Sequence, residues 1–154
     1  MSTKNVDTAV KMKKLLIAFG AAVIAGGLAL AAIGLIKGTD SPAAYTAAAA
    51  VWVSLIASQV IFWRANKIRK INDDKDLRGI GAFRFFSSRE AGCADGALIL
   101  SVVWVTYMAV SLPTNKILVT TAVALLYMSL NFHCMFNGIN YRYVKKFCKG
   151  VQKK

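Results

Sequence analysis

Acidic side chains are scarce in this sequence, which has seven Asp and Glu residues against 20 Lys and Arg and a net charge of +13 over 154 residues. It contains no paired-carboxylate pattern, nucleophile elbow or zinc-protease motif, and general acid and base candidates are scarce, so an enzyme is the least supported class. The single His and the three Cys show none of the H-x-x-x-H, C-x-x-C or E-x-x-H spacings typical of metal sites. We therefore expect no enzyme activity and no cofactor, and the odd cysteine count predicts no disulfide framework.

Charge is also absent from four long stretches, and these stretches decide the fold class. Uncharged runs of 22, 23, 20 and 25 residues make up 90 of the 154 residues. A bilayer core about 30 Å thick needs about 20 helical residues, so each run is long enough to cross it. The chain outside the runs is too short for a separate soluble catalytic domain. The sequence predicts an all-α integral membrane protein with four transmembrane helices, at residues 15–36, 41–63, 88–112 and 115–141.

Basic residues are divided unevenly between the two sides of this predicted bundle. Of the 20 Lys and Arg, 18 lie before the first run, between the second and third, or after the fourth. Because positive flanks resist translocation, we expect the N-terminal segment 1–14, the connection 64–87 and the tail 142–154 in the cytoplasm. The expected location is a bacterial cytoplasmic membrane. The same charge favours anionic headgroups over nucleic acid as a partner, since no nucleic-acid-binding motif accompanies it.

Three pairs of residues mark where helices should begin. Ser41 followed by Pro42 predicts an N-cap with proline at the first helical position. Ser87 and Glu90 have the S-x-x-E spacing of a capping box, with Ser87 as the cap of the third helix. Thr114 or Asn115 is expected to cap the fourth helix after the break at Pro113. The connections between helices one and two and between helices three and four are therefore short.

Small residues form regular stripes on the first two helices. Gly20, Gly27 and Gly34 are seven residues apart, and Ala47 and Ser54 belong to a stripe on the second helix. Such stripes let helix backbones approach closely in lipid, where no hydrophobic force acts between helices. We expect the two helices to form a close antiparallel pair, with Gly27 at a close contact. A pivot for alternating access is the functional alternative.

The fourth helix carries an unusual number of polar side chains. At 100° per residue, His133, Asn137 and Asn140 share one face, and Asn131 lies on another. Polar groups in lipid need protein partners, so a helix with two polar faces should contact protein on both. One face can point into the bundle, and the other is then left for a second copy or another membrane protein.

Asp95 is the one acid close to an apolar run, and carboxylates inside membranes are often functional. We expect it near the cytoplasmic surface, paired with Arg142 or Lys145. With Asn131, His133, Asn137 and Asn140 it defines either a polar vestibule or a face for a partner.

The connection between helices two and three contains an aromatic and basic segment. Phe83, Arg84, Phe85 and Phe86 follow one another without an acid. Aromatic rings next to a cation are typical of the headgroup layer, so we expect these four residues to contact lipid at the membrane surface.

Two functions remain consistent with these patterns. The first is a small accessory, regulatory or immunity-type subunit that acts by interaction, as a homo-oligomer or with another membrane protein. The alternative is a small oligomeric transporter or channel with a polar vestibule on the cytoplasmic side. Against transport, the sequence places no acid deep inside a span, which proton-coupled exchangers normally need.

Overall fold

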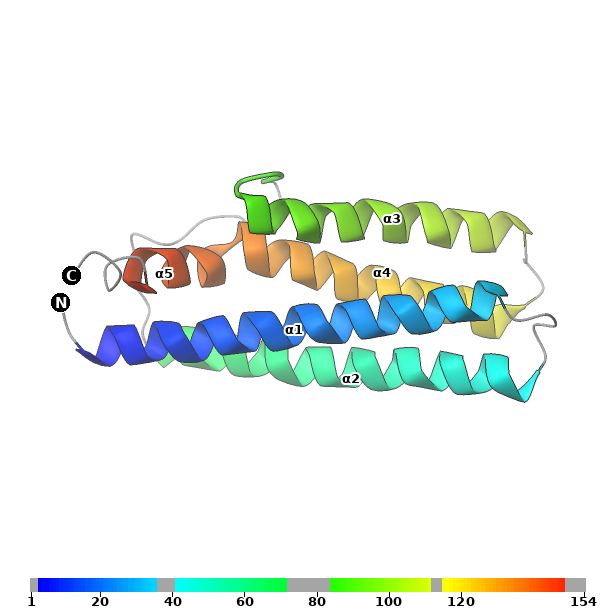
Figure 1. Ribbon diagram of the computed structural model, residues 1–154, viewed down its shortest axis with the longest axis horizontal. Helices are drawn as coiled ribbons and strands as arrows, with labels where there is room; N and C mark the ends of the chain where they lie inside the picture. Colours follow the sequence, from blue (N-terminus) through cyan, green and yellow to red (C-terminus); the bar gives the residue numbers. More distant parts are fainter. Residues whose placement is uncertain (1–2, 36–40, 72–83, 112–114, 149–154) are drawn as a thin grey trace.

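The computed structural model describes residues 3–35, 41–71, 84–111 and 115–148, and its regular elements are all α-helices. Helices α1 to α4 lie side by side along the long axis, and α5 extends the bundle at one end (Figure 1). Four candidate spans are long and apolar enough to cross a membrane. The prediction of an all-α protein with four helices of membrane length is confirmed. The five helices are α1 (Thr3–Leu35), α2 (Pro42–Ile71), α3 (Arg89–Ser111), α4 (Lys116–Asn137) and α5 (Ile139–Cys148).

Helix α4 is the centre of the bundle, and α3 is attached to it along one side. The most extensive contact joins α1 to α2, and α4 packs on both of them. Helix α3 packs extensively on α4, and its contacts with the other described helices are few. Eleven of the 22 residues of α4 are buried, against five of the 23 residues of α3. The bundle is therefore a three-helix core of α1, α2 and α4, to which α3 is attached along one side.

Both described chain ends lie at the same end of the bundle, where α5 and the first turns of α1 extend beyond the start of α3 (Figure 1). We call it the basic end, and it comprises the first turns of α1, the last turns of α2, the start of α3 and all of α5. The 33 residues of α1 extend about 50 Å, more than the bilayer core of about 30 Å. The first turns of α1 therefore continue past the apolar zone, where Ala9 packs with Tyr143 and Phe147 of α5.

The fourth predicted helix is interrupted, which corrects the expected range of 115–141. Helix α4 ends at Asn137, and Gly138 adopts an extended conformation with φ −95° and ψ −162°. Helix α5 then starts at Ile139 and packs against α1. The uncharged run continues through this position to Tyr141, so the length of the run did not reveal the break.

Two of the three predicted helix caps are confirmed. The Ser41 hydroxyl accepts a hydrogen bond from the Ala44 amide at 3.2 Å, and the Asn115 side chain accepts one from Leu118 at the same distance. The third cap was placed one residue too early. The Ser88 hydroxyl, not that of Ser87, accepts the bond from the Ala91 amide at 3.1 Å.

The glycine of α1 at the closest helix contact is Gly26 and not the predicted Gly27. A methyl group at Gly27 would meet nothing within 4 Å, whereas one at Gly26 would lie 2.8 Å from Cε of Met128 and 3.4 Å from Cβ of Ser54. The prediction for Gly27 is wrong because adjacent helical positions point about 100° apart, and Gly26 is the one that faces α2 and α4.

The other predicted packing residues have different outcomes. A methyl group at Gly20 would lie 3.3 Å from the Phe132 ring, so Gly20 is close to α4. Ala47 is half-buried against the apolar core, and Ser54 meets Gly26 across the α1–α2 contact. The surroundings of Gly34 lie outside the described part of the chain. Close approach of α1 and α2 therefore depends on small residues on both helices.

Candidate functional site

A buried polar cluster joins α3 to α4 near the basic end. His133 Nδ1 lies 2.5 Å from Asp95 Oδ1, and the Asn137 amide group donates to the same oxygen at 2.7 Å. Asp95 is 0% exposed, and His133 and Asn137 are each 1% exposed. Asp95 lies in the second turn of α3, while His133 and Asn137 are one turn apart at the end of α4. Their spacing of four residues places both side chains on the face that meets α3.

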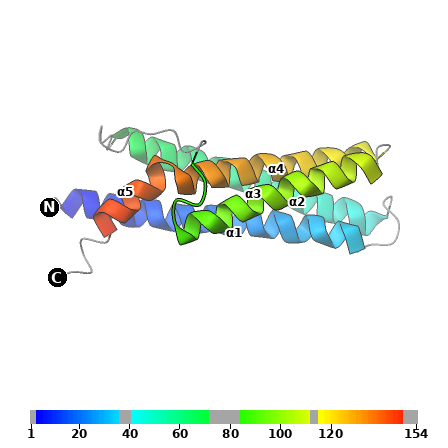
Figure 2. The ribbon, with the colours of Figure 1, turned by 90° about the horizontal axis from the view of Figure 1, so that it is seen from above.

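The segment before α3 closes this cluster. The Phe86 amide donates to Asp95 Oδ2 at 2.5 Å, and the Ser87 hydroxyl donates to Asn137 Oδ1 at 2.7 Å. The Phe85 ring lies over His133, with 4.5 Å between ring centroids. Figure 2 shows this segment crossing the end of α4 where α5 begins. We use "polar cluster" for Asp95, His133 and Asn137 together with the Phe86 amide and Ser87.

The backbone at Phe86 is strained, and the polar cluster explains why. Its φ of 51° lies in the left-handed region, which costs an L-residue about 1 to 2 kcal/mol. This conformation directs the amide toward Asp95, so a charge-assisted hydrogen bond offsets the strain. Strained backbone persists only where surrounding contacts hold it in place. The Asp95 carboxylate therefore determines the path of the chain into α3.

Both oxygens of the Asp95 carboxylate have hydrogen-bond partners. The carboxylate receives hydrogen bonds from a backbone amide and from an Asn amide group, and it shares a third hydrogen bond with His133 Nδ1. A satisfied buried network of this kind gives a contact a defined geometry. Within the described ranges, no three His, Cys, Asp or Glu side chains come close enough to hold a metal ion.

A second polar contact joins α3 to α4 closer to the middle of the bundle. We call this contact and the polar cluster together the polar seam. The hydroxyls of Ser101 in α3 and Ser129 in α4 are 2.7 Å apart, and both residues are buried. Ser129 lies one turn before His133, so the seam follows one face of α4. Hydrogen bonds between membrane helices contribute about 0.6 to 2 kcal/mol each. The seam therefore fixes the register of α3 against α4.

The structure unites three of the five residues expected at a polar vestibule or partner face. The expected pairing of Asp95 with Arg142 or Lys145 is wrong, because its partners in the described chain are those of the polar cluster. Side chains on the neighbouring helix lie closer than the cations of α5, since the chain turns at Gly138.

Asn131 and Asn140 lie apart from the polar cluster. The Asn131 amide group donates to Gln59 of α2 at 3.5 Å, so this second polar face finds a partner in the same chain. Asn140 is buried in the first turn of α5, beyond the helix break. The second face of α4 therefore gives less reason to expect an oligomer than the sequence alone did.

Sequence patterns did not reveal the remaining members of the seam. Ser87 was interpreted as a helix cap, and the Phe86 amide is a backbone group that any residue supplies. Ser101 sits among apolar residues with no spacing that marks it. Their role in joining α3 to α4 follows from the packing of these two helices and not from the sequence.

The predicted lipid-contact segment lies at the edge of the polar cluster. Phe83 is outside the described residues. Arg84, Phe85 and Phe86 are exposed, so the Arg84 guanidinium and the two aromatic rings are accessible at the basic end. Contact of this segment with lipid headgroups stays a prediction.

The fold and the polar cluster define a class rather than a family. The chain is an all-α protein with four helices long and apolar enough to span a membrane, compatible with an integral membrane protein. No family model matches it, and comparisons with curated proteins and with solved structures gave no significant match.

Proposed function

We propose that the protein is a small accessory or regulatory subunit that acts by association within the membrane. The observation that carries this proposal is the position of α3, which packs extensively on α4 alone. Much of α3 is exposed, including Ile99, Val102 and Val110. A helix attached on one side has free surface for a helix of another membrane protein, or of a second copy. An immunity-type role belongs to the same class.

The proposed orientation has both termini in the cytoplasm, with the bacterial cytoplasmic membrane as the expected location. Two features support it: 18 of the 20 basic residues fall on one side of the four runs, and both described chain ends lie at one end of the bundle. On this orientation the basic end faces anionic headgroups of the inner leaflet.

Cysteine labelling tests the orientation. In a variant without the three native cysteines, Ser111→Cys at the opposite end should react with an impermeant maleimide applied to intact cells. Lys146→Cys, on α5, should react after permeabilisation only. Both positions are exposed, so a difference in labelling reports on the side of the membrane. Labelling of Lys146→Cys in intact cells would show that the proposed orientation is inverted.

The alternative function is transport, and one observation favours it. Asp95 and His133 form a buried ionisable pair, and such pairs inside membranes mark proton pathways in many transporters. Against it, the Asp95 side chain is enclosed and each of its two oxygens accepts a hydrogen bond from the same chain. A permeation path needs a group that a passing ion can reach.

Flux and photocrosslinking together separate the two functions. A photoreactive amino acid at Val102 or Val110 of α3 should give a discrete crosslinked species of defined mass in cells. The same group at Val53 or Ile56 of α2, which are also exposed, is the matched control and should give none. Proton and potassium flux in vesicles should stay at background for the wild type and for Asp95→Asn.

Two results would contradict the proposal. One is equal crosslinking from α2 and α3, which would show contact by chance. The other is a reproducible flux that Asp95→Asn removes while the protein still elutes as a folded species. That outcome would assign the polar cluster to transport.

A further inference from the structure

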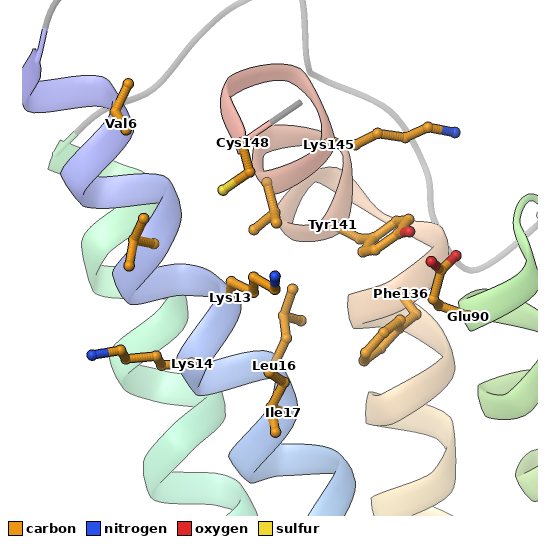
Figure 3. A pocket seen from close by; sticks show the side chains of 12 residues that line it. Val6, Lys13, Lys14, Leu16, Ile17, Glu90, Phe136, Tyr141, Lys145 and Cys148 are labelled. Atoms are coloured by element: carbon orange, nitrogen blue, oxygen red, sulfur yellow. The ribbon is translucent and has the colours of Figure 1, made fainter. Parts of the chain in front are cut away.

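A large hollow opens at the basic end between the first half of α1, the helix α5 and the start of α3 (Figure 3). Its volume is about 700 Å³. Its walls are mainly apolar side chains, among them Val10 and Ile17 of α1, Phe136 of α4 and Val144 of α5. Val10 and Ile17 are exposed there. At this level of the bundle the apolar run of α1 begins, so the hollow lies where headgroups meet hydrocarbon.

Cations dominate the rim of this hollow. Lys13 and Lys14 of α1 and Lys145 of α5 lie along it, against the single acid Glu90 of α3. Figure 3 shows Lys13 extending into the space between α1 and α5, while Lys14 and Lys145 point outward on opposite sides. The Glu90 carboxylate is engaged in a hydrogen bond with Tyr141. The rim therefore presents net positive charge to an occupant.

A second hollow of about 460 Å³ follows along the same side of the bundle, between α1 and α3. Gly27 and Leu30 of α1 and Ala97 of α3 line it, and Phe132 of α4 forms part of its floor. It exists because α1 and α3 do not pack closely and because Gly27 has no side chain to fill the gap. Its lining is mainly apolar; the polar groups in it are the Ser101 and Ser129 hydroxyls, which bond to each other, the Cys93 thiol and the Trp104 indole N–H.

The two hollows have the dimensions of one lipid molecule. Lys13 and Gly27 are 14 residues apart on α1, or about 21 Å, so with Lys13 at the phosphates Gly27 lies near the middle of a bilayer core of about 30 Å, where the acyl chains of one leaflet end. The basic rim thus lies at headgroup level while the second hollow lies at acyl-chain depth. Both volumes fall within about 300 to 1,000 Å³, the usual range of small-ligand sites.

We propose that these two hollows bind one anionic phospholipid, with its phosphate at Lys13 and an acyl chain between α1 and α3. A hydrophobic helix of a partner would fill the apolar gap but would bring no anion to the rim. A lipid supplies both, and its chain would support α3 on the side that no helix covers. This inference goes beyond the proposed association, because it concerns a different surface and does not need a protein partner.

Lipid titration of the full-length protein tests the site. Delipidated protein is titrated with phosphatidylglycerol or phosphatidylcholine of identical chains, and bound lipid is counted by native mass spectrometry. One phosphatidylglycerol should bind at least tenfold more tightly than phosphatidylcholine, and inorganic phosphate should not compete. Lys13→Gln should weaken phosphatidylglycerol about fivefold, since one basic side chain near an anionic surface contributes about 1 kcal/mol.

Matched controls separate a site from general charge attraction. Lys11→Gln removes an exposed lysine of α1 that does not line the hollow, and it should leave the affinity within twofold. Gly27→Leu should lower retention of both lipids by filling the second hollow, whereas Ala25→Leu, at an exposed position outside it, should not.

Three results would overturn the proposal. Equal affinity for the two lipids would show that the basic rim does not select the headgroup. An equal loss of phosphatidylglycerol affinity in Lys11→Gln and Lys13→Gln would show unspecific charge attraction. Unchanged lipid retention in Gly27→Leu, together with loss of a dimer, would instead assign the gap to a second copy of the chain.

Discussion

Replacing Asp95 with alanine should lower the free energy of unfolding by about 3 kcal/mol, the largest effect we expect from a single side chain. The change leaves the Phe86 amide, His133 Nδ1 and the Asn137 amide group without their hydrogen-bond partner in a buried place. Breaking a buried pair by removing one partner costs about 3 to 5 kcal/mol in soluble proteins, and single contacts between membrane helices contribute less. Unfolding in mixed micelles with increasing dodecyl sulfate measures the effect.

An exposed acid is the control for this result. Asp7→Ala, in the second turn of α1, should change the free energy of unfolding by less than about 0.5 kcal/mol. The double variant Asp95→Ala, His133→Ala should lose less free energy of unfolding than the sum of the two single losses, because both substitutions remove the same contact. Full additivity would show that the two side chains do not stabilise the bundle through each other.

Introducing isoleucine at Gly26 should destabilise the bundle by about 1 to 3 kcal/mol, as expected for overpacking of a close contact. Even a methyl group there would press against Met128 and meet Ser54 of α2, and a branched side chain is far larger. Gly27→Ile provides an unusually close control because it adds the same side chain one residue away, where nothing lies within 4 Å. It should change the stability by less than about 0.5 kcal/mol.

The same dodecyl sulfate titration compares these two variants. Greater loss of stability for Gly27→Ile than for Gly26→Ile would show that α1 is rotated about its axis relative to the arrangement described above. In that rotated arrangement Gly27 would not leave a gap between α1 and α3 for the acyl chain.

The polar cluster and the lipid site concern the same question, which is how α3 is held. At the basic end, hydrogen bonds fix α3 to α4 through Asp95, and along its length the Ser101–Ser129 contact maintains the register. Its side toward α1 is left open. A helix held at few points can respond to what occupies its open side, which is a useful property in a regulatory subunit.

The class of protein was determined by the sequence alone, through the length of its uncharged runs. Burial of a charge in lipid is so costly that four runs of 20 or more uncharged residues leave few other folds. Two helix starts were also predictable, because Ser41 and Asn115 act through the backbone a few residues away. Such features depend on neighbouring residues and on the lipid around the helix, so they can be predicted from the sequence.

Only the tertiary structure decided which polar groups meet. The sequence placed Asp95, His133 and Asn137 among the candidates, but their partners depend on the register and rotation of α3 against α4. A rotation of 100° separates Gly26 from Gly27, and periodicity does not set that angle when helices are apolar on nearly every face. The break at Gly138 and the backbone amide of Phe86 depend on the same packing. In lipid, close packing and hydrogen bonding between helices replace the hydrophobic effect as the source of specificity, and both are properties of pairs of helices.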